Sequence, residues 1–82
     1  NYFTVFPNPA NNLINIEFNK STEDINVVMF NSLGELVNEV YSGNTQNNQT
    51  ISIELNRFSP GVYVIHAIDP TTTIKQLFTI NR

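Results

Sequence analysis

The sequence predicts an all-β protein, with about seven antiparallel strands arranged as a sandwich of two sheets. Apolar and polar residues alternate with a period of two along most of the chain, as they do in strands with one buried face. Turn-forming Pro, Gly, Asn and Asp residues recur between the apolar runs. No stretch shows the apolar period of an amphipathic helix.

The chain opens with a short predicted strand over Tyr2–Phe6, followed by Pro7, Asn8, Pro9 and Ala10. The two proline rings hold φ near about −65°, and Pro9 pushes Asn8 toward extended backbone. We call residues Pro7–Ala10 the proline corner. It is expected to be stiff and kinked, and to fix where the next strand enters its sheet.

The next strands differ in how far they are expected to be covered. Over Leu13–Phe18 the apolar side chains alternate with Asn15 and Glu17, as expected for one buried face. After a polar connection, Asn19–Asp24, the run Ile25–Phe30 is almost continuously apolar. Such a run suits a strand at the centre of a sheet or one covered on both faces.

A hairpin is predicted in the middle of the chain. Asn31-Ser32-Leu33-Gly34 is typical of a turn with Gly34 at positive φ, so that Leu36–Tyr41 returns as a strand. Ser42–Asn48 is expected to be a polar loop without means of packing. Thr50–Leu55 then shows the cleanest alternation in the chain.

The last third of the chain begins with Asn56–Pro60, which is too short for a helix but allows one helical turn with Phe58 tucked inward. Pro60 and Gly61 are the pair expected at the centre of a type II turn, where glycine accepts positive φ. The remaining elements are strands over Val62–Ile68 and Ile74–Ile80, joined by a turn over Asp69–Thr73.

The composition bounds the class of protein. At 82 residues we expect a single domain, residues 1–82, with a thin core. Hydrophobic residues make up 40% and charged residues only 13%, and Asn occurs 14 times, so uncharged polar groups must supply solubility. The net charge is −3 and the four cations are scattered, which argues against nucleic acid and anionic membrane surfaces as partners.

Several structural classes are excluded or disfavoured by what the sequence lacks. Without Cys, neither a disulfide nor a thiolate metal site can form. No apolar run approaches the roughly 18 to 20 residues of a membrane span, so we expect no membrane insertion, and no signal-peptide pattern is visible. The sequence does not start with Met, and we expect it to be part of a longer precursor whose N-terminus carries any export signal.

The residues that could carry catalysis are few. His66 is the single histidine and lies within a predicted strand, where a solvated strand face explains it better than a nucleophile pair or a metal site. Glu17, Glu35, Glu39 and Glu54 could pair as glycosidase carboxylates, but Glu17 and Glu54 fall on polar strand faces. We therefore expect no enzyme activity and no catalytic residue.

Metal or cofactor binding is not expected either. Glu23, Asp24 and Asp69 do not form the alternating acidic loop that calcium requires. We expect Glu23 and Asp24 to form a turn before a strand.

A sugar-binding role is an open alternative. The six Phe and three Tyr residues could form a stacking surface, although Trp is absent. In this alternative the chain is a fibronectin-like structural or carbohydrate-binding module of a secreted enzyme, and aromatic side chains form an exposed row on one face. Most of them stand at alternating strand positions, which favours a place in the core.

Five groups of residues, in order and at fitting spacing, resemble one family. They are Val5–Ala10, Leu13–Ile16, Phe30–Val37, Leu55 with Pro60–Val64, and Lys75–Ile80. Together they resemble the type A C-terminal sorting domain of the type IX (Por) secretion system of Bacteroidetes, over nearly the whole chain.

The resemblance implies an immunoglobulin-like β-sandwich that serves as a non-catalytic secretion signal for a cargo protein on its N-terminal side. It implies transit through the periplasm, recognition by a β-barrel shuttle and export to the cell surface or the extracellular space. A surface sortase would remove the domain and join the cargo to lipopolysaccharide or release it. Cleavage is expected upstream of Asn1.

The resemblance also implies which residues matter. The family-motif positions are Pro7, Asn8, Pro9, Gly34, Pro60, Gly61 and Tyr63. The segment expected to engage the export machinery is Lys75, Gln76, Leu77, Phe78, Thr79, Ile80, Asn81 and Arg82. The glycines, Pro60 and Tyr63 are also explained by backbone geometry and packing alone.

The last predicted strand suggests how recognition could work. If Ile74–Ile80 is an edge strand, its unpaired backbone groups offer a surface for strand addition by the machinery. Exposed strand edges would also allow a homodimer.

Overall fold

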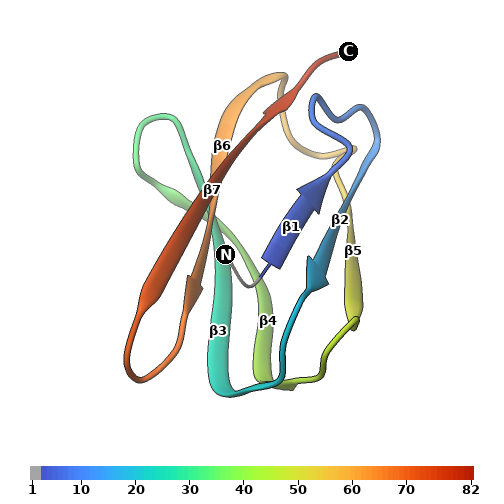
Figure 1. Cartoon of the computed structure of the whole chain (residues 1–82). Helices are drawn as coiled ribbons and strands as arrows, with labels where there is room; N and C mark the ends of the chain where they lie inside the picture. The colour runs from blue at the N-terminus through green and yellow to red at the C-terminus, as the bar shows by residue number, and fades with distance from the viewer. Residues whose placement is uncertain (1–2) are drawn as a thin grey trace.

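The computed structural model describes residues 3–82 and contains two antiparallel sheets packed face to face as an immunoglobulin-like sandwich (Figure 1). The three-stranded sheet has the order β1-β2-β5 and the four-stranded sheet the order β4-β3-β6-β7. The strands are β1 (Phe3–Phe6), β2 (Leu13–Phe18), β3 (Thr22–Asn31), β4 (Leu36–Thr45), β5 (Thr50–Glu54), β6 (Gly61–Ile68) and β7 (Thr73–Ile80). The all-β sandwich predicted from the sequence is confirmed. Tyr2, expected in the first strand, lies outside the described residues.

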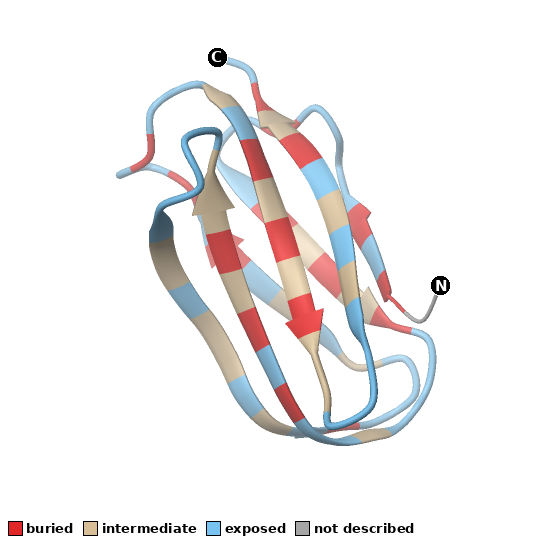
Figure 2. Cartoon of the chain, turned by 90° about the vertical axis from the view of Figure 1, so that its left-hand side faces the viewer, coloured by how far each residue is buried: buried red, intermediate tan, exposed pale blue. Residues whose placement is uncertain are grey.

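The core lies between the two sheets and is built by the alternation seen in the sequence (Figure 2). Ile14, Ile16 and Phe18 of β2 are fully buried, whereas Asn15 and Glu17 lie on the outer face. The other sheet contributes inward side chains from its inner strands and from β7: Ile25, Val27, Met29, Tyr63, Ile65, Ala67, Phe78 and Ile80.

The apolar run over β3 lies at the centre of its sheet, paired on both sides with β4 and β6. The strand is not covered on both faces, because Val28 and Phe30 remain half-buried on the outer face. It also begins three residues earlier than expected, at Thr22. The predicted turn at Glu23-Asp24 is wrong: a register shift and a positive φ of 55° at Asp24 mark an irregularity inside the strand.

β4 is longer than the sequence suggested, and the prediction of a loop from Ser42 is wrong. Ser42, Gly43 and Thr45 pair with the start of β3, and the Ser42 hydroxyl donates to the side chain of Asn26 at 3.0 Å. Thr45 is buried, although the segment was expected to have no means of packing. Pairing with β3 bonds the backbone groups of this segment, so it forms a strand although its side chains are polar.

The hairpin between β3 and β4 is confirmed, with Gly34 at φ 84°. The Asn31 side chain holds it together: its Oδ1 accepts from the N–H groups of Leu33 and Glu35, each at 3.0 Å. At the turn before β6, the Phe58 N–H donates to the Leu55 carbonyl at 3.0 Å and the Phe58 ring is buried, as expected.

Candidate functional site

β7 is an edge strand, as the strand-addition hypothesis required. It pairs with β6 over eight residues in an unbroken register from Thr73 to Ile80. The other outer strands are shorter or irregular: β1 has 4 residues, β5 has 5, and the β3–β4 pairing contains register shifts. Short strands and bulges blunt an edge. β7 is therefore the most regular edge among the described strands.

The proline corner covers the C-terminal half of this edge. Ala10 forms a parallel bridge with Ile80: its N–H donates to the Thr79 carbonyl at 2.7 Å, and its carbonyl accepts from the Asn81 N–H at 2.8 Å. Figure 1 shows the end of β7 beside the loop between β1 and β2. Residues that the sequence placed in two separate motifs thus form one structural unit.

Asn8 extends this cover with its side chain. Its Oδ1 accepts the Thr79 N–H at 3.1 Å, and its Nδ2 approaches the Leu77 carbonyl at 3.5 Å. The peptide bonds before Pro7 and Pro9 are both cis. Through its two side-chain contacts, Asn8 takes the place of a neighbouring strand beside Leu77 and Thr79.

The last residue is also tied back to the body. The Arg82 guanidinium donates to the Asn11 carbonyl at 3.0 Å and to the Phe58 carbonyl. Both acceptors belong to loops at the same end of the sandwich as the proline corner. Of the segment Lys75–Arg82 expected to face the machinery, Phe78 and Ile80 are buried in the core, and Thr79, Asn81 and Arg82 form hydrogen bonds with the proline corner and the neighbouring loops.

Pro60, Gly61 and Tyr63 lie at the start of β6. The Tyr63 hydroxyl donates to the Ser59 carbonyl at 2.7 Å, and its ring stacks on Phe78 at a centroid separation of 5.8 Å. A tyrosine that bonds to backbone just upstream is a recurrent corner of immunoglobulin-like sandwiches. Gly61 has the expected positive φ, but 150° is far from the roughly 80° of a type II turn, and Gly61 already pairs with Ile80 in the sheet.

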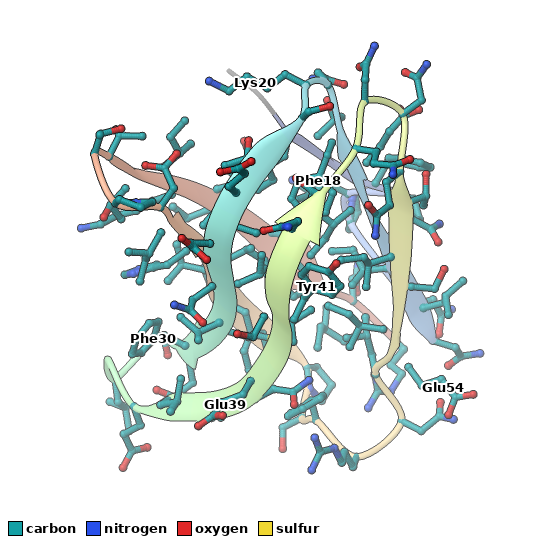
Figure 3. All side chains as sticks on the ribbon, turned by 90° about the horizontal axis from the view of Figure 1, so that it is seen from below. Phe18, Lys20, Phe30, Glu39, Tyr41 and Glu54 are labelled. Carbon is teal, nitrogen blue, oxygen red and sulfur yellow. The ribbon has the colours of Figure 1, made fainter. Side chains whose placement is uncertain are left out.

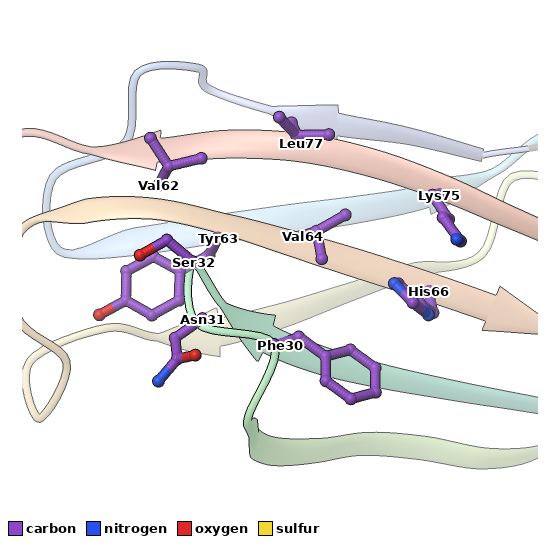
Figure 4. A pocket seen from close by; sticks show the side chains of 10 residues that line it. Phe30, Asn31, Ser32, Val62, Tyr63, Val64, His66, Lys75 and Leu77 are labelled. Atoms are coloured by element: carbon purple, nitrogen blue, oxygen red, sulfur yellow. The ribbon is translucent and has the colours of Figure 1, made fainter.

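An apolar row crosses the outer face of the four-stranded sheet and ends at β7. Leu36, Phe30, Val64 and Leu77 are successive cross-strand partners on β4, β3, β6 and β7. Leu36 is 50% exposed and Leu77 is 59% exposed. Phe30, Val64 and Leu77 line a shallow hollow of about 480 Å³, whose rim includes Gly34 and the hairpin (Figure 4).

His66 and Lys75 form the next cross-strand pair beside this row. The His66 ring packs against Phe30 at 4.4 Å between centroids. Partial burial, and then the positive charge of Lys75, lower the pKa of His66. The outer-face position expected for His66 is confirmed.

The acidic residues do not gather into a catalytic or metal-binding group. Figure 3 shows Glu39 on β4 and Glu54 at the end of β5 well apart. Among residues 3–82, no group of three or more His, Cys, Asp and Glu side chains is placed to hold a metal ion.

Asp69 caps the β6–β7 turn: its Oδ1 accepts from the Thr71 and Thr72 N–H groups at 2.9 and 2.8 Å. The backbone N–H of Thr71 lowers the pKa of Asp69 most; burial opposes this, and the Thr72 N–H and the Thr71 hydroxyl lower the pKa further. Within the described chain, no helix is long and apolar enough to span a bilayer.

Within residues 3–82, the aromatic side chains do not form the exposed row that a sugar-binding face would need. Phe3, Phe18, Phe58, Tyr63 and Phe78 are buried in the core. Phe30 and Tyr41 are half-buried, and Phe6 is 39% exposed. The pattern does not favour the carbohydrate-binding alternative.

The cover over the edge of β7 is the part of the site that reasoning from sequence missed. Ala10 belonged to the proline corner but was given no contact with β7, and Asn11 did not stand out because it contributes its backbone carbonyl. A signal was present: a rigid Pro-Asn-Pro segment with an amide side chain at its centre can hold that side chain against a strand.

These features define an immunoglobulin-like sandwich in which Asn8, Gly61 and Tyr63 contact the last strand. The chain matches the family model described as secretion system C-terminal sorting domain, over residues 4–81. It belongs to this family, the sorting domains of type IX secretion. No curated protein gives a significant match to the chain. Membership implies export toward the cell surface or the extracellular space, an N-terminal cargo and contact with secretion machinery.

Proposed function

We propose that residues 1–82 form one non-catalytic sorting domain that directs an attached cargo from the periplasm across the outer membrane. The outer-membrane shuttle and then the sortase bind the domain, and the sortase cleaves it from the cargo upstream of Asn1. The family match over residues 4–81 carries the proposal. The regular edge strand β7 supports it, because strand addition reads backbone more than side chains. A single receptor can then serve many unrelated cargoes.

A gain-of-function experiment tests this proposal. The 82 residues are fused to the C-terminus of a periplasmic reporter in a host with a working type IX system, and surface reporter is measured on intact cells. We expect surface display, and periplasmic retention in a matched host that lacks the shuttle. A folded fusion that stays in the periplasm of the competent host contradicts the proposal.

A further inference from the structure

The edge of β7 is divided into a covered half and an open half. In an antiparallel ladder, the N–H and C=O groups of alternate residues point away from the partner strand. The Thr79 N–H and carbonyl point away from β6, because they bond to Asn8 and Ala10. Because this direction alternates from one residue to the next, the N–H and C=O groups of Thr73, Lys75 and Leu77 also point away from β6.

The covered half ends at Leu77. Its carbonyl receives side-chain donors from Asn8 and from Gln76, the latter at 3.2 Å. Beyond this point no strand of the described chain lies beside β7. The open groups are thus the backbone N–H and C=O of Thr73 and Lys75 and the N–H of Leu77.

The exposed side chains along the open half are those of Thr73, one cation and one apolar group. Lys75 is exposed and forms no ion pair within residues 3–82, and Leu77 ends the apolar row Leu36–Phe30–Val64–Leu77. A strand added here places one residue directly beside Lys75 and another, two positions along, beside Leu77. A carboxylate suits the first position and an apolar side chain suits the second.

A second copy of this chain fits the open half poorly. Antiparallel pairing of two β7 strands around a two-fold axis, using all the open residues, sets Lys75 against Lys75, which is destabilising. If the two strands shift toward their C-terminal ends, the pairing has to include Thr79, which the proline corner covers. If they shift toward their N-terminal ends, the pairing has to include the turn before Thr73. A lysine on an edge strand is a common protection against self-pairing.

Resting on the proposed function, we propose that Thr73–Leu77 is a strand-addition site for an extended segment of the outer-membrane shuttle. That segment carries a carboxylate beside Lys75 and an apolar residue beside Leu77. The proline corner limits the register of the added strand to this half of β7, and Lys75 selects the acidic partner over a second copy of the chain.

The backbone contribution is tested with the substitution Leu77→Pro in the reporter fusion. Proline is tolerated on an edge strand where its missing N–H faces outward, so this variant removes an open donor and leaves the β6–β7 ladder in place. Leu77→Ala is the matched control that loses the side chain but keeps the N–H. With purified shuttle in detergent as the probe, we expect binding about tenfold weaker for Leu77→Pro and a smaller loss for Leu77→Ala.

The charge contribution is tested with Lys75→Glu, which changes an exposed side chain and does not depend on how well proline is accommodated. We expect at least about tenfold weaker binding to the shuttle for Lys75→Glu, with the difference from wild type shrinking at high salt. Circular dichroism and thermal melting check that each variant is folded.

Binding of wild-type strength by both Leu77→Pro and Lys75→Glu overturns this inference. So does a wild-type dimer in sedimentation that Leu77→Pro converts to monomer, because the second copy would then be the occupant. If either of these two results is found while the wild-type fusion reaches the surface, the proposed function stands and only the assignment of Thr73–Leu77 as the binding site is wrong. If the wild-type fusion itself neither binds the shuttle nor reaches the surface, the proposed function fails.

Discussion

The Asn8 side-chain oxygen accepts the backbone N–H of Thr79 at 3.1 Å, across 71 residues of sequence. This bond joins the proline corner to β7, the last strand of the chain. Together with the two backbone bonds of Ala10, it gives the end of β7 a neighbour on the side where the sheet stops. The motif around Pro7 and Pro9 therefore has a structural role in presenting β7.

Asn8→Ala is expected to loosen the end of β7. The variant removes the acceptor for the Thr79 N–H, and the pair is exposed, so the loss of stability should be about 0.5 to 1 kcal/mol. Hydrogen exchange should show faster exchange of the Thr79 amide. Asn8→Asp keeps the acceptor oxygen and should retain most of the protection. Unchanged exchange in Asn8→Ala would contradict this assignment.

Tyr63→Phe tests the corner at the start of β6. The ring can remain stacked on Phe78, but the hydrogen bond to the Ser59 carbonyl is lost. We expect the free energy of unfolding to fall by about 1 kcal/mol, measured by urea denaturation. Ser59→Ala is the control, because the acceptor is a main-chain carbonyl that this change keeps. Equal losses in both variants would show that the bond is not responsible.

Thr45→Val is expected to stabilise the protein. The hydroxyls of Thr45 and its cross-strand partner Thr22 are buried without a hydrogen-bond partner. A buried unsatisfied hydroxyl costs about 1 to 3 kcal/mol, and valine replaces it with a methyl group. A gain of about 1 kcal/mol corresponds to a rise in Tm of roughly 4 to 8 °C. The same change at exposed Thr50 should give a smaller rise, and a lower Tm for Thr45→Val would contradict the prediction.

His66 should make the stability depend on pH. Partial burial and Lys75 lower the pKa of His66 in the folded chain. The unfolded chain then binds more protons, so stability is full above about pH 6.5 and falls as the pH drops toward the lower folded pKa. Melting temperatures between pH 8 and pH 5 should show this fall in wild type and a smaller one in His66→Gln. Lys75→Gln should also reduce it, and an identical profile in all three would contradict the mechanism.

Much of the fold could be predicted because burial follows the period of the side chains. The alternation in β2 and β5 identified the inward residues, and Gly34 identified the hairpin. The extension of β4 to Thr45 could not be seen, because a polar segment becomes a strand only when a partner strand supplies its backbone bonds. Side-chain pattern carries no information about that pairing.

The candidate site was predictable only in part. From the sequence we expected β7 to close the chain and the proline corner to be rigid, but we did not predict that the two touch. Their contacts run through backbone groups of Ala10, Thr79 and Asn81 and through one amide side chain. Backbone contacts between distant segments depend on topology, which a single sequence encodes only weakly.

The central claim is that export machinery reads the last strand of this sandwich. The most direct measurement is the surface fraction of a reporter fused to the chain with and without Lys75–Arg82, in the same type IX-competent host. We predict that the deletion leaves the cargo in the periplasm while the intact chain reaches the surface. Equal surface display of the two fusions would contradict the claim.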